Sequence, residues 1–537
     1  MSAFDTVIGI VGSPAFPEIE WSDEQLASLK ELGCTTLQLS IAWASKPAGE
    51  VLNLEDLDER QRGLWRHRIN QAQKFGLGTI AHFGIPRWLN QTPVKPACIL
   101  APEVRDRYTR LVTDFAASFP EVDDILVYTF DQQAWICSDY GPCPRCSGIP
   151  LHERLPGFLD HLKEVYVSAN PRATLWWKPW ELSKGQTEMI ARRVDAEHFG
   201  LILNPSTSNE CYPFNDRAFA ADLGVKTLTR IAAERGIPVI GEIDHTLYKG
   251  LYQISDYFPR LVYEQLEEWK RIPGVVGIKE YFGLPPSQLS VNAAMLGACL
   301  RSPEASLEQL LEQVAAPFGT QAAPALIAAW EQVAVGVESF PWDITYLIGP
   351  MGLSRDHDGS HGWDQITIPN AHWDTPIWES NRRANFMLTH EHKAHPWLFE
   401  DAGLRLGAAA DCYDQAAADY AEAIAHAAAM ADELQAQQDE LKATARALRG
   451  TSLHFLETLA AHNARMVQHD DEQWRKVVGR LERLLEQDAA NQGHAQEMVQ
   501  VLAAFRRDPH GWLATHLSAR SHELICTIDW RAWTPST

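Results

Sequence analysis

Short apolar runs alternate with longer amphipathic stretches along the first 300 residues of the chain. Runs of strand length, rich in β-branched and aromatic residues, lie at 6–12, 35–43, 78–85, 125–131, 173–181, 199–206, 237–244 and 275–282. Helical periodicity lies between them, at 22–32, 56–75, 103–118, 156–168, 217–235 and 258–271. Ser22 stands where the first of these helices would need an N-terminal cap. Eight strand–helix units of about 30 residues each predict an α/β fold, a (β/α)8 TIM barrel over residues 1–300.

An open, doubly wound parallel sheet is the alternative for such an alternation. It would need a glycine-rich, phosphate-binding turn after the first strand. The segment IGIVGSPAF at 8–16 matches that turn poorly. We therefore favour the closed barrel.

The pattern changes after residue 300. Residues 301–403 combine helical segments with a stretch at 340–400 that is rich in Trp, His, Asp and Arg and has neither a helical nor a strand period. Long loops in compact proteins are usually functional, so we predict a lid over the barrel mouth; an ordinary surface loop is the alternative. The side chains that the lid would offer to a ligand are Trp363, Trp373, Arg355 and Arg382. The metal-compatible residues within it are spaced too irregularly to favour a metal site: Asp356, His357, Asp358 and His361.

Residues 404–537 have a third composition, rich in Ala, Glu and Leu at helical spacing. We predict an α-helical bundle of long helices, with Gly450 as a helix stop. Such a bundle would either dock on the barrel or mediate a homo-oligomer.

Charge and cysteine content limit the partners and the compartment. The formal net charge of -23 and the pI of about 5.3 argue against nucleic acid or an anionic membrane as a partner. The N-terminal segment lacks the basic region and apolar core of a secretory signal, and no apolar run of about 18 residues is present to span a bilayer. Nine cysteines, mostly scattered, fit a reducing compartment. We expect a cytoplasmic protein.

Polar and aromatic residues gather at the carboxyl ends of the predicted strands, where barrels of this kind bind their ligands. They are Trp43, His82, Trp88, Asp131, Gln132, Trp177, Lys178, Glu181, Asn204, Glu242, Asp244, His245, Glu280 and Tyr281. Aromatic faces stack on sugar rings, and paired carboxyl groups cleave glycosidic bonds, so this mixture indicates a carbohydrate substrate. Glu242 follows the apolar run IPVIG, where a carboxylate is costly unless a site uses it. Glu181 and Asp244 have an alternative role as structural ion-pair partners.

Two segments resemble a known group of enzymes. LKELGCTTLQLSIAWASKPAGEVLNLEDLD at 29–58 and GLGTIAHFGIPRWL at 76–89 resemble the opening units of the retaining β-glycosidases built on (β/α)8 barrels. The family 42 β-galactosidase-type enzymes are the most similar, with a helix ending in Leu-Gly, a strand ending in Trp and a third strand ending in Pro-x-Trp-Leu. The resemblance covers roughly the first 300 residues, and it implies a glycoside hydrolase that acts on a short oligosaccharide or glycoside.

The same resemblance implies a structural zinc ion. In the family, a Cys-Pro-x-Cys cluster follows the fourth strand and a further ligand follows the third. The matching positions here are Cys98, Cys137, Cys143 and Cys146, which would form a closed four-thiolate site. The family's tight Cys-x-Cys spacing is replaced by five residues between Cys137 and Cys143, and free or partly paired thiols are the alternative.

The resemblance also assigns the catalytic carboxylates. It implies Glu242 as the nucleophile, but the acid/base glutamate of the family's Asn-Glu pair is replaced by Gln132, which cannot donate and retrieve a proton. We rank the remaining proton donors in the order Asp131, Glu280 and Glu181. The segment GIKEYFG at 277–283 resembles the Glu-Tyr-x-Gly element of α-glucuronidases, which implies an alternative inverting mechanism with Glu280 as one carboxylate.

Three functions remain open at this point. The first is a glycoside hydrolase with Glu242 as nucleophile or base and a pocket lined by Trp43, His82, Trp88, Trp177, His245 and Tyr281. The second is a non-catalytic sugar-binding barrel that lost its acid/base at Gln132. The third is a barrel lyase or isomerase whose general base has His245 or Lys178 as a partner.

Overall fold

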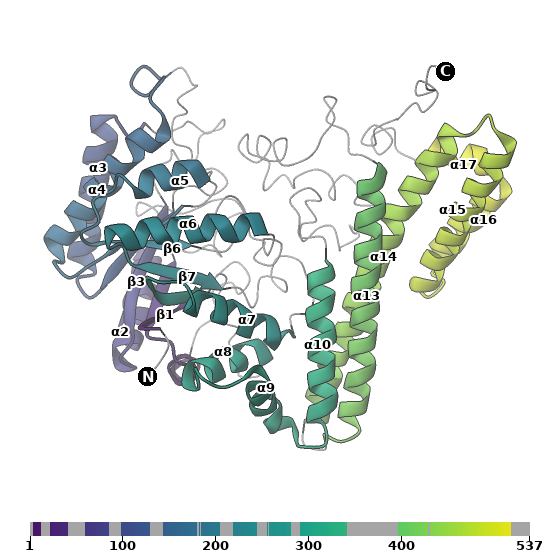
Figure 1. Ribbon diagram of the computed structural model, residues 1–537, viewed down its shortest axis with the longest axis horizontal. Helices are drawn as coiled ribbons and strands as arrows, with labels where there is room; N and C mark the ends of the chain where they lie inside the picture. Colours follow the sequence, from purple (N-terminus) through teal and green to yellow (C-terminus); the bar gives the residue numbers. More distant parts are fainter. Residues whose placement is uncertain are drawn as a thin grey trace. The chain divides into compact units, whose positions relative to one another are not determined.

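The computed structural model of the chain describes residues 4–11, 22–40, 59–84, 98–128, 143–179, 182, 184–203, 219–243, 255, 257–280, 290–340, 396–427 and 430–516. All structural statements concern these residues, with helices and strands labelled as in Figure 1.

Eight parallel strands form a closed barrel in sequence order, with β8 paired to β1. They are β1 (Thr6–Val11), β2 (Thr36–Ser40), β3 (Gly78–Gly84), β4 (Asp124–Tyr128), β5 (Leu175–Lys178), β6 (Phe199–Leu203), β7 (Val239–Ile243) and β8 (Val275–Glu280). Buried β-branched and aromatic residues dominate these strands, as is usual for parallel sheets covered by helices. The predicted (β/α)8 barrel is confirmed.

Helices follow the strands around the barrel. They are α1 (Asp23–Leu32), α2 (Glu59–Lys74), α3 (Pro102–Ser118), α4 (Leu151–Ala169), α5 (Lys184–Ala191), α6 (Phe219–Arg235), α7 (Pro259–Lys270), α8 (Val291–Arg301) and α9 (Leu307–Ala315). Ser22 caps α1 as predicted, because its side chain accepts a hydrogen bond from the Gln25 backbone while the Gln25 side chain accepts one from the Ser22 backbone. Gly33 ends the helix in the left-handed conformation, at φ 116°.

The start of α4 differs from the prediction. The helix begins at Leu151, whereas the predicted start was residue 156, so Pro156 lies inside it. A proline inside a helix leaves the carbonyl four residues earlier without its usual donor. Here Arg193 donates to the carbonyl oxygen of His152 at 2.8 Å, so the helix continues through Pro156 with that acceptor satisfied.

Two glycines in the strands make room for tryptophan rings. A Cβ atom on Gly200 in β6 would lie 2.3 Å from the ring of Trp176, which belongs to the neighbouring β5. A Cβ atom on Gly241 in β7 would lie 2.2 Å from the ring of Trp269 in α7. Only a residue without a side chain leaves room for these rings beside the strands.

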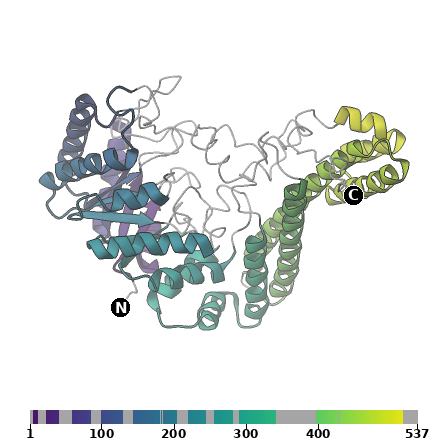
Figure 2. The ribbon, with the colours of Figure 1, turned by 45° about the horizontal axis from the view of Figure 1, so that its top comes forward.

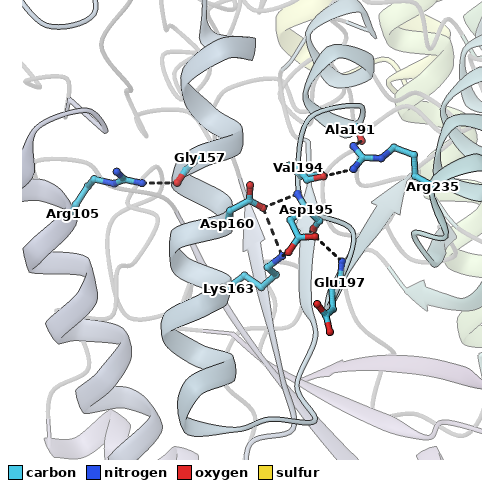
Figure 3. A network of polar contacts seen from close by, with 9 residues as sticks. All are labelled: Arg105, Gly157, Asp160, Lys163, Ala191, Val194, Asp195, Glu197 and Arg235. Carbon is cyan, nitrogen blue, oxygen red and sulfur yellow. Dashed lines mark hydrogen bonds and ion pairs between the residues drawn. The ribbon is translucent and has the colours of Figure 1, made fainter.

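Polar contacts join neighbouring helices around the barrel (Figure 3). Lys163 of α4 is buried and donates to both the carboxylate and the backbone carbonyl of Asp195, at 2.6 and 3.0 Å. Arg235 of α6 donates to the carbonyl oxygens of Ala191 and Val194, at 2.9 and 2.6 Å. Asp195 precedes β6, so this network lies toward the amino ends of the strands, away from the end that binds ligands in such barrels.

A second compact unit follows the barrel unit. The barrel unit comprises residues 1–251 and 256–317, and the second unit comprises 252–255 and 318–537. The helices of the second unit are α10 (Ala323–Ser339), α13 (Pro396–Ile424), α14 (Ala431–Met466), α15 (Asp471–Asn491), α16 (Gln496–Arg507) and α17 (Pro509–His516). In both views α10, α13 and α14 lie side by side (Figure 2). The predicted helical region is confirmed.

The predicted helix stop at Gly450 is wrong. Helix α14 runs through this glycine from Ala431 to Met466. A glycine inside a helix costs about 1 kcal/mol relative to alanine. The long buried face of α14, which packs against α13 and α15, offsets that cost.

Two other predictions from the sequence concern the lid and membrane-spanning segments. The predicted lid at 340–400 falls almost entirely outside the described residues. Among the described helices, none is both long enough and apolar enough to cross a lipid bilayer.

Candidate active site

Five polar side chains share the inner face of the barrel toward the carboxyl ends of the strands. Side chains alternate between the two faces of a strand, and residues paired in register between parallel strands share a face. Tyr128 pairs with Lys178, and Glu242 pairs with Lys279. The ring of His82 lies against that of Tyr128, with 4.3 Å between their centroids.

Glu242 is the centre of this cluster. Its side chain is buried, with 1% of its surface exposed, and both of its carboxylate oxygens accept hydrogen bonds from ammonium groups. Lys279 Nζ donates to Oε1 at 2.8 Å, and Lys178 Nζ donates to Oε2. Burial alone would raise the pKa of Glu242, but the charges of Lys178 and Lys279 and their hydrogen bonds lower it below its ordinary value. Glu242 is therefore ionised at neutral pH.

His82 offers an uncharged polar group beside this cluster. Its side chain is 4% exposed, and its Nε2 atom has no hydrogen-bond partner in the described part of the chain. Burial, together with the charge of Lys279, lowers the pKa of His82 to about 3. The neutral imidazole can exchange a hydrogen bond with a ligand hydroxyl group without adding charge to the site.

Helix α7 fixes the backbone on which Glu242 stands. Trp269 packs against Gly241, and its indole N–H donates to the backbone carbonyl of Glu242 at 2.9 Å. The ring is almost fully buried, so this contact is shielded from water. The glycine before Glu242 thus lets a helix hold the strand at Glu242.

The structure brings together three of the residues predicted from the sequence, namely Glu242, Lys178 and His82. Trp177 was predicted to line the pocket, but it alternates with Lys178 along β5, is fully buried and packs against Phe199. This position on the opposite face of the strand does not support the predicted role.

The remaining predicted site residues lie outside the described parts. They are Trp43, Trp88, Asp131, Gln132, Glu181, Asn204, Asp244, His245 and Tyr281, with Cys137 of the thiol group. Glu280 is the last residue of β8, and its side chain also lies outside the described parts.

Sequence reasoning missed Lys279 and Tyr128. The signal for Lys279 was present, because it interrupts the apolar run of β8 as Glu242 interrupts that of β7. A charged residue within a buried strand needs a partner, and two such residues of opposite sign on adjacent strands predict a pair. Tyr128 carried no comparable signal.

Three thiols form a second cluster. The Sγ atoms of Cys98, Cys143 and Cys146 all lie within 4.8 Å of one another, and Cys98 and Cys146 are buried. Bonds of about 2.3 Å to a tetrahedral zinc ion place sulfur atoms about 3.8 Å apart, so these thiols fit three corners of such a site. A hydrogen bond from the Arg145 backbone lowers the pKa of Cys143 to about 6, which favours the thiolate that zinc requires.

Comparison with known proteins finds solved structures with a similar fold. No protein-family model and no curated protein matches the sequence. Among solved structures, a family 138 glycoside hydrolase that targets the pectin rhamnogalacturonan II matches with a TM-score of 0.58 at 11% identity, over 93% of this chain and 77% of that chain. An O-GlcNAc hydrolase variant of Thermobaculum terrenum matches with a TM-score of 0.45 at 11% identity, over 95% of this chain and 98% of that chain. A broad-specificity family 5 endoglucanase from an uncultured bacterium matches with a TM-score of 0.36 at 12% identity, over 52% and 84%.

The first of these matches shows that the chain shares the fold of the family 138 enzyme over most of its length. The predicted closeness to family 42 is not confirmed by these comparisons and stays a prediction. Within the shared fold, the arrangement at Glu242 is a buried, ionised carboxylate toward the carboxyl ends of the barrel strands, beside a neutral imidazole.

Proposed function

We propose that the protein is a glycoside hydrolase in which Glu242 supplies the ionised catalytic carboxylate. The observation that carries this proposal is the burial of Glu242 as an anion on the inner face of the barrel, at the end where such barrels bind ligands. Burying a carboxylate is costly, and hydrolysis of a glycosidic bond is a reaction that uses one. The fold shared with the family 138 enzyme supports the same class of reaction.

Hydrolysis breaks the bond between the anomeric carbon and the glycosidic oxygen. The departing oxygen takes up a proton, and the hydroxyl group of water ends on the anomeric carbon. Glu242 takes part as an anion, either by attacking the anomeric carbon or by accepting a proton from the attacking water. A second group gives the proton to the departing oxygen, and Asp131 is our first candidate.

The substrate is a carbohydrate, for which we propose a short oligosaccharide or a glycoside. His82 would bind one of its hydroxyl groups through Nε2, since that atom is polar, buried and uncharged. The family 138 neighbour targets a pectic polysaccharide, so uronides belong among the substrates to be tested.

The lyase or isomerase alternative receives less support. In that alternative Lys178 is the partner of a general base. Lys178 and Lys279 do pair with a carboxylate, that of Glu242, but the chain shares its fold with a glycoside hydrolase.

We also propose that Cys98, Cys143 and Cys146 bind a structural zinc ion, with Cys137 as the fourth ligand. The thiols precede α3 and α4, so a bound ion would brace the connections that follow β3 and β4. Its chemistry would be structural, because four thiolates leave no position for a reacting molecule.

The experiment is hydrolysis of a panel of aryl α- and β-glycosides, uronides included, by the wild-type protein and by Glu242→Gln. Glu164→Gln, on the exposed surface of α4, is the matched control. We expect turnover of at least one glycoside by the wild type and the control, with a loss of about a hundredfold or more in Glu242→Gln. Equal turnover by Glu242→Gln, or ligand binding without any turnover by the wild type, would refute the proposal.

A further inference from the structure

Two lysines from different strands hold the carboxylate of Glu242. Lys178 is the last residue of β5 and donates to Oε2, whereas Lys279 lies in β8 and donates to Oε1. All three side chains are at most 2% exposed. One carboxylate therefore lies between two ammonium groups in a place that water barely reaches.

This arrangement decides the protonation state of Glu242. A carboxyl group buried without a positive partner favours its neutral form, whereas nearby cations favour the ionised form. Among the described residues, the charged groups that face Glu242 are Lys178 of β5 and Lys279 of β8. The neighbouring His82 of β3 is neutral and adds no charge. The balance toward the anion thus depends on both lysines.

The same contacts fix the orientation of the carboxylate. Hydrogen bonds to both oxygens from two strands prevent rotation about the terminal bond of the side chain. Each carboxylate oxygen has two acceptor positions, and the described residues fill one on each oxygen, which leaves a position for a reacting atom. Preorganised groups of this kind need little rearrangement when the reaction occurs.

We propose that Lys178 and Lys279 are positioning residues that keep Glu242 as an oriented anion, so that Glu242 is never the proton donor of the reaction. This inference rests on the proposed function, because it assigns roles within the same site. It requires the proton for the departing oxygen to come from another residue.

The test compares the pH dependence of kcat/KM in the wild type, Lys279→Met and Lys178→Met. We expect the acid limb of the profile to move to higher pH by at least one unit in each variant, because loss of one cation raises the pKa of Glu242. Lys270→Met is the matched control, since Lys270 also pairs with a glutamate, Glu267, but lies in α7. Its profile should keep the wild-type acid limb.

A second measurement does not depend on turnover. The urea midpoints of wild type, Lys279→Met, Glu242→Gln and the double variant form a double-mutant cycle. We expect the double variant to lose less than the sum of the two single losses, because each single change leaves a buried charge without its partner. Lys178→Met replaces Lys279→Met in the cycle if the latter does not fold.

The outcomes separate the two proposals. A wild type that hydrolyses glycosides, with variants whose acid limb does not move, would overturn the role of the lysines and leave the proposed function standing. A double variant whose loss of stability equals the sum of the two single losses would overturn the role of the lysines as well. A wild type that turns over no glycoside in the panel would refute the proposed function, whatever the cycle shows.

Discussion

Replacing Gly241 by alanine would place a methyl group where the ring of Trp269 lies. The added Cβ atom would be 2.2 Å from Cδ2 and 2.4 Å from Cε2 of the indole. Carbon atoms in proteins pack at about 3.5 to 4.0 Å, so the ring or the strand must move by more than 1 Å. Either movement stretches the hydrogen bond from Trp269 to the carbonyl oxygen of Glu242, which is 2.9 Å long.

Two costs add in this variant. Overpacking of a well-packed core costs about 1–3 kcal/mol. Loss of the buried hydrogen bond leaves the indole N–H and the carbonyl without a partner, for roughly a further 1–2 kcal/mol. We therefore expect Gly241→Ala to lower the free energy of unfolding of the barrel unit by about 2–5 kcal/mol. It should also reduce turnover, because the strand that carries Glu242 shifts.

The assay is urea unfolding followed by far-UV circular dichroism, with hydrogen exchange of β7 peptides to assign the change to the barrel. Gly157→Ala is the matched control, since Gly157 lies exposed in α4 and its new methyl group would contact nothing within 4 Å. That control should be stabilised by roughly 0.5–1 kcal/mol, because alanine suits a helix better than glycine. If Gly241→Ala unfolds at the same urea concentration as Gly157→Ala, the close packing of Trp269 on β7 is refuted.

Two further predictions concern sites away from Glu242. Lys163→Met should lower stability by about 1–3 kcal/mol between pH 5 and 8, because it removes the buried donor to Asp195. The hydrogen bond from Lys163 lowers the pKa of Asp195, so this difference in urea midpoint should shrink as the pH falls below about 4, with the part from the backbone carbonyl of Asp195 remaining; a difference of unchanged size there would contradict the ion pair. For the thiol cluster, elemental analysis should find about one zinc ion per wild-type chain and a loss of zinc in Cys143→Ser, whereas Cys412→Ser in the second unit should keep it. A folded wild type that contains no zinc after purification without chelators would refute that proposal.

The barrel was predictable because its physical signal is local. Strands covered by helices read as short apolar runs, and all eight runs became strands. The short helix α5 was not among the predicted helices, since eight residues give too few turns for a periodic pattern. The prediction of a helix stop at Gly450 was wrong because packing along a 36-residue helix outweighs the local preference of one glycine.

The site was predictable only in part. Glu242 could be predicted because it is a charged residue directly after an apolar run. Its partner Lys178 could be predicted because it lies at a strand end, where ligand-binding residues are expected. Trp177 shows where this reasoning fails, because the face of a strand depends on counting alternate residues from a residue known to point inward. Which residues of β5, β7 and β8 point inward is clear only from the arrangement of these strands in one barrel.

The central claim is that Glu242 is the catalytic anion, acting on the anomeric carbon or on the attacking water, and rescue by azide tests it most directly. Glu242→Ala is assayed on the aryl glycoside that the wild type cleaves best, with and without sodium azide, after its fold is verified by circular dichroism. We predict turnover about a hundredfold or more below wild type, restored by azide, with a glycosyl azide product of inverted anomeric configuration. A folded variant with wild-type turnover, or an azide product of retained configuration, would contradict the claim.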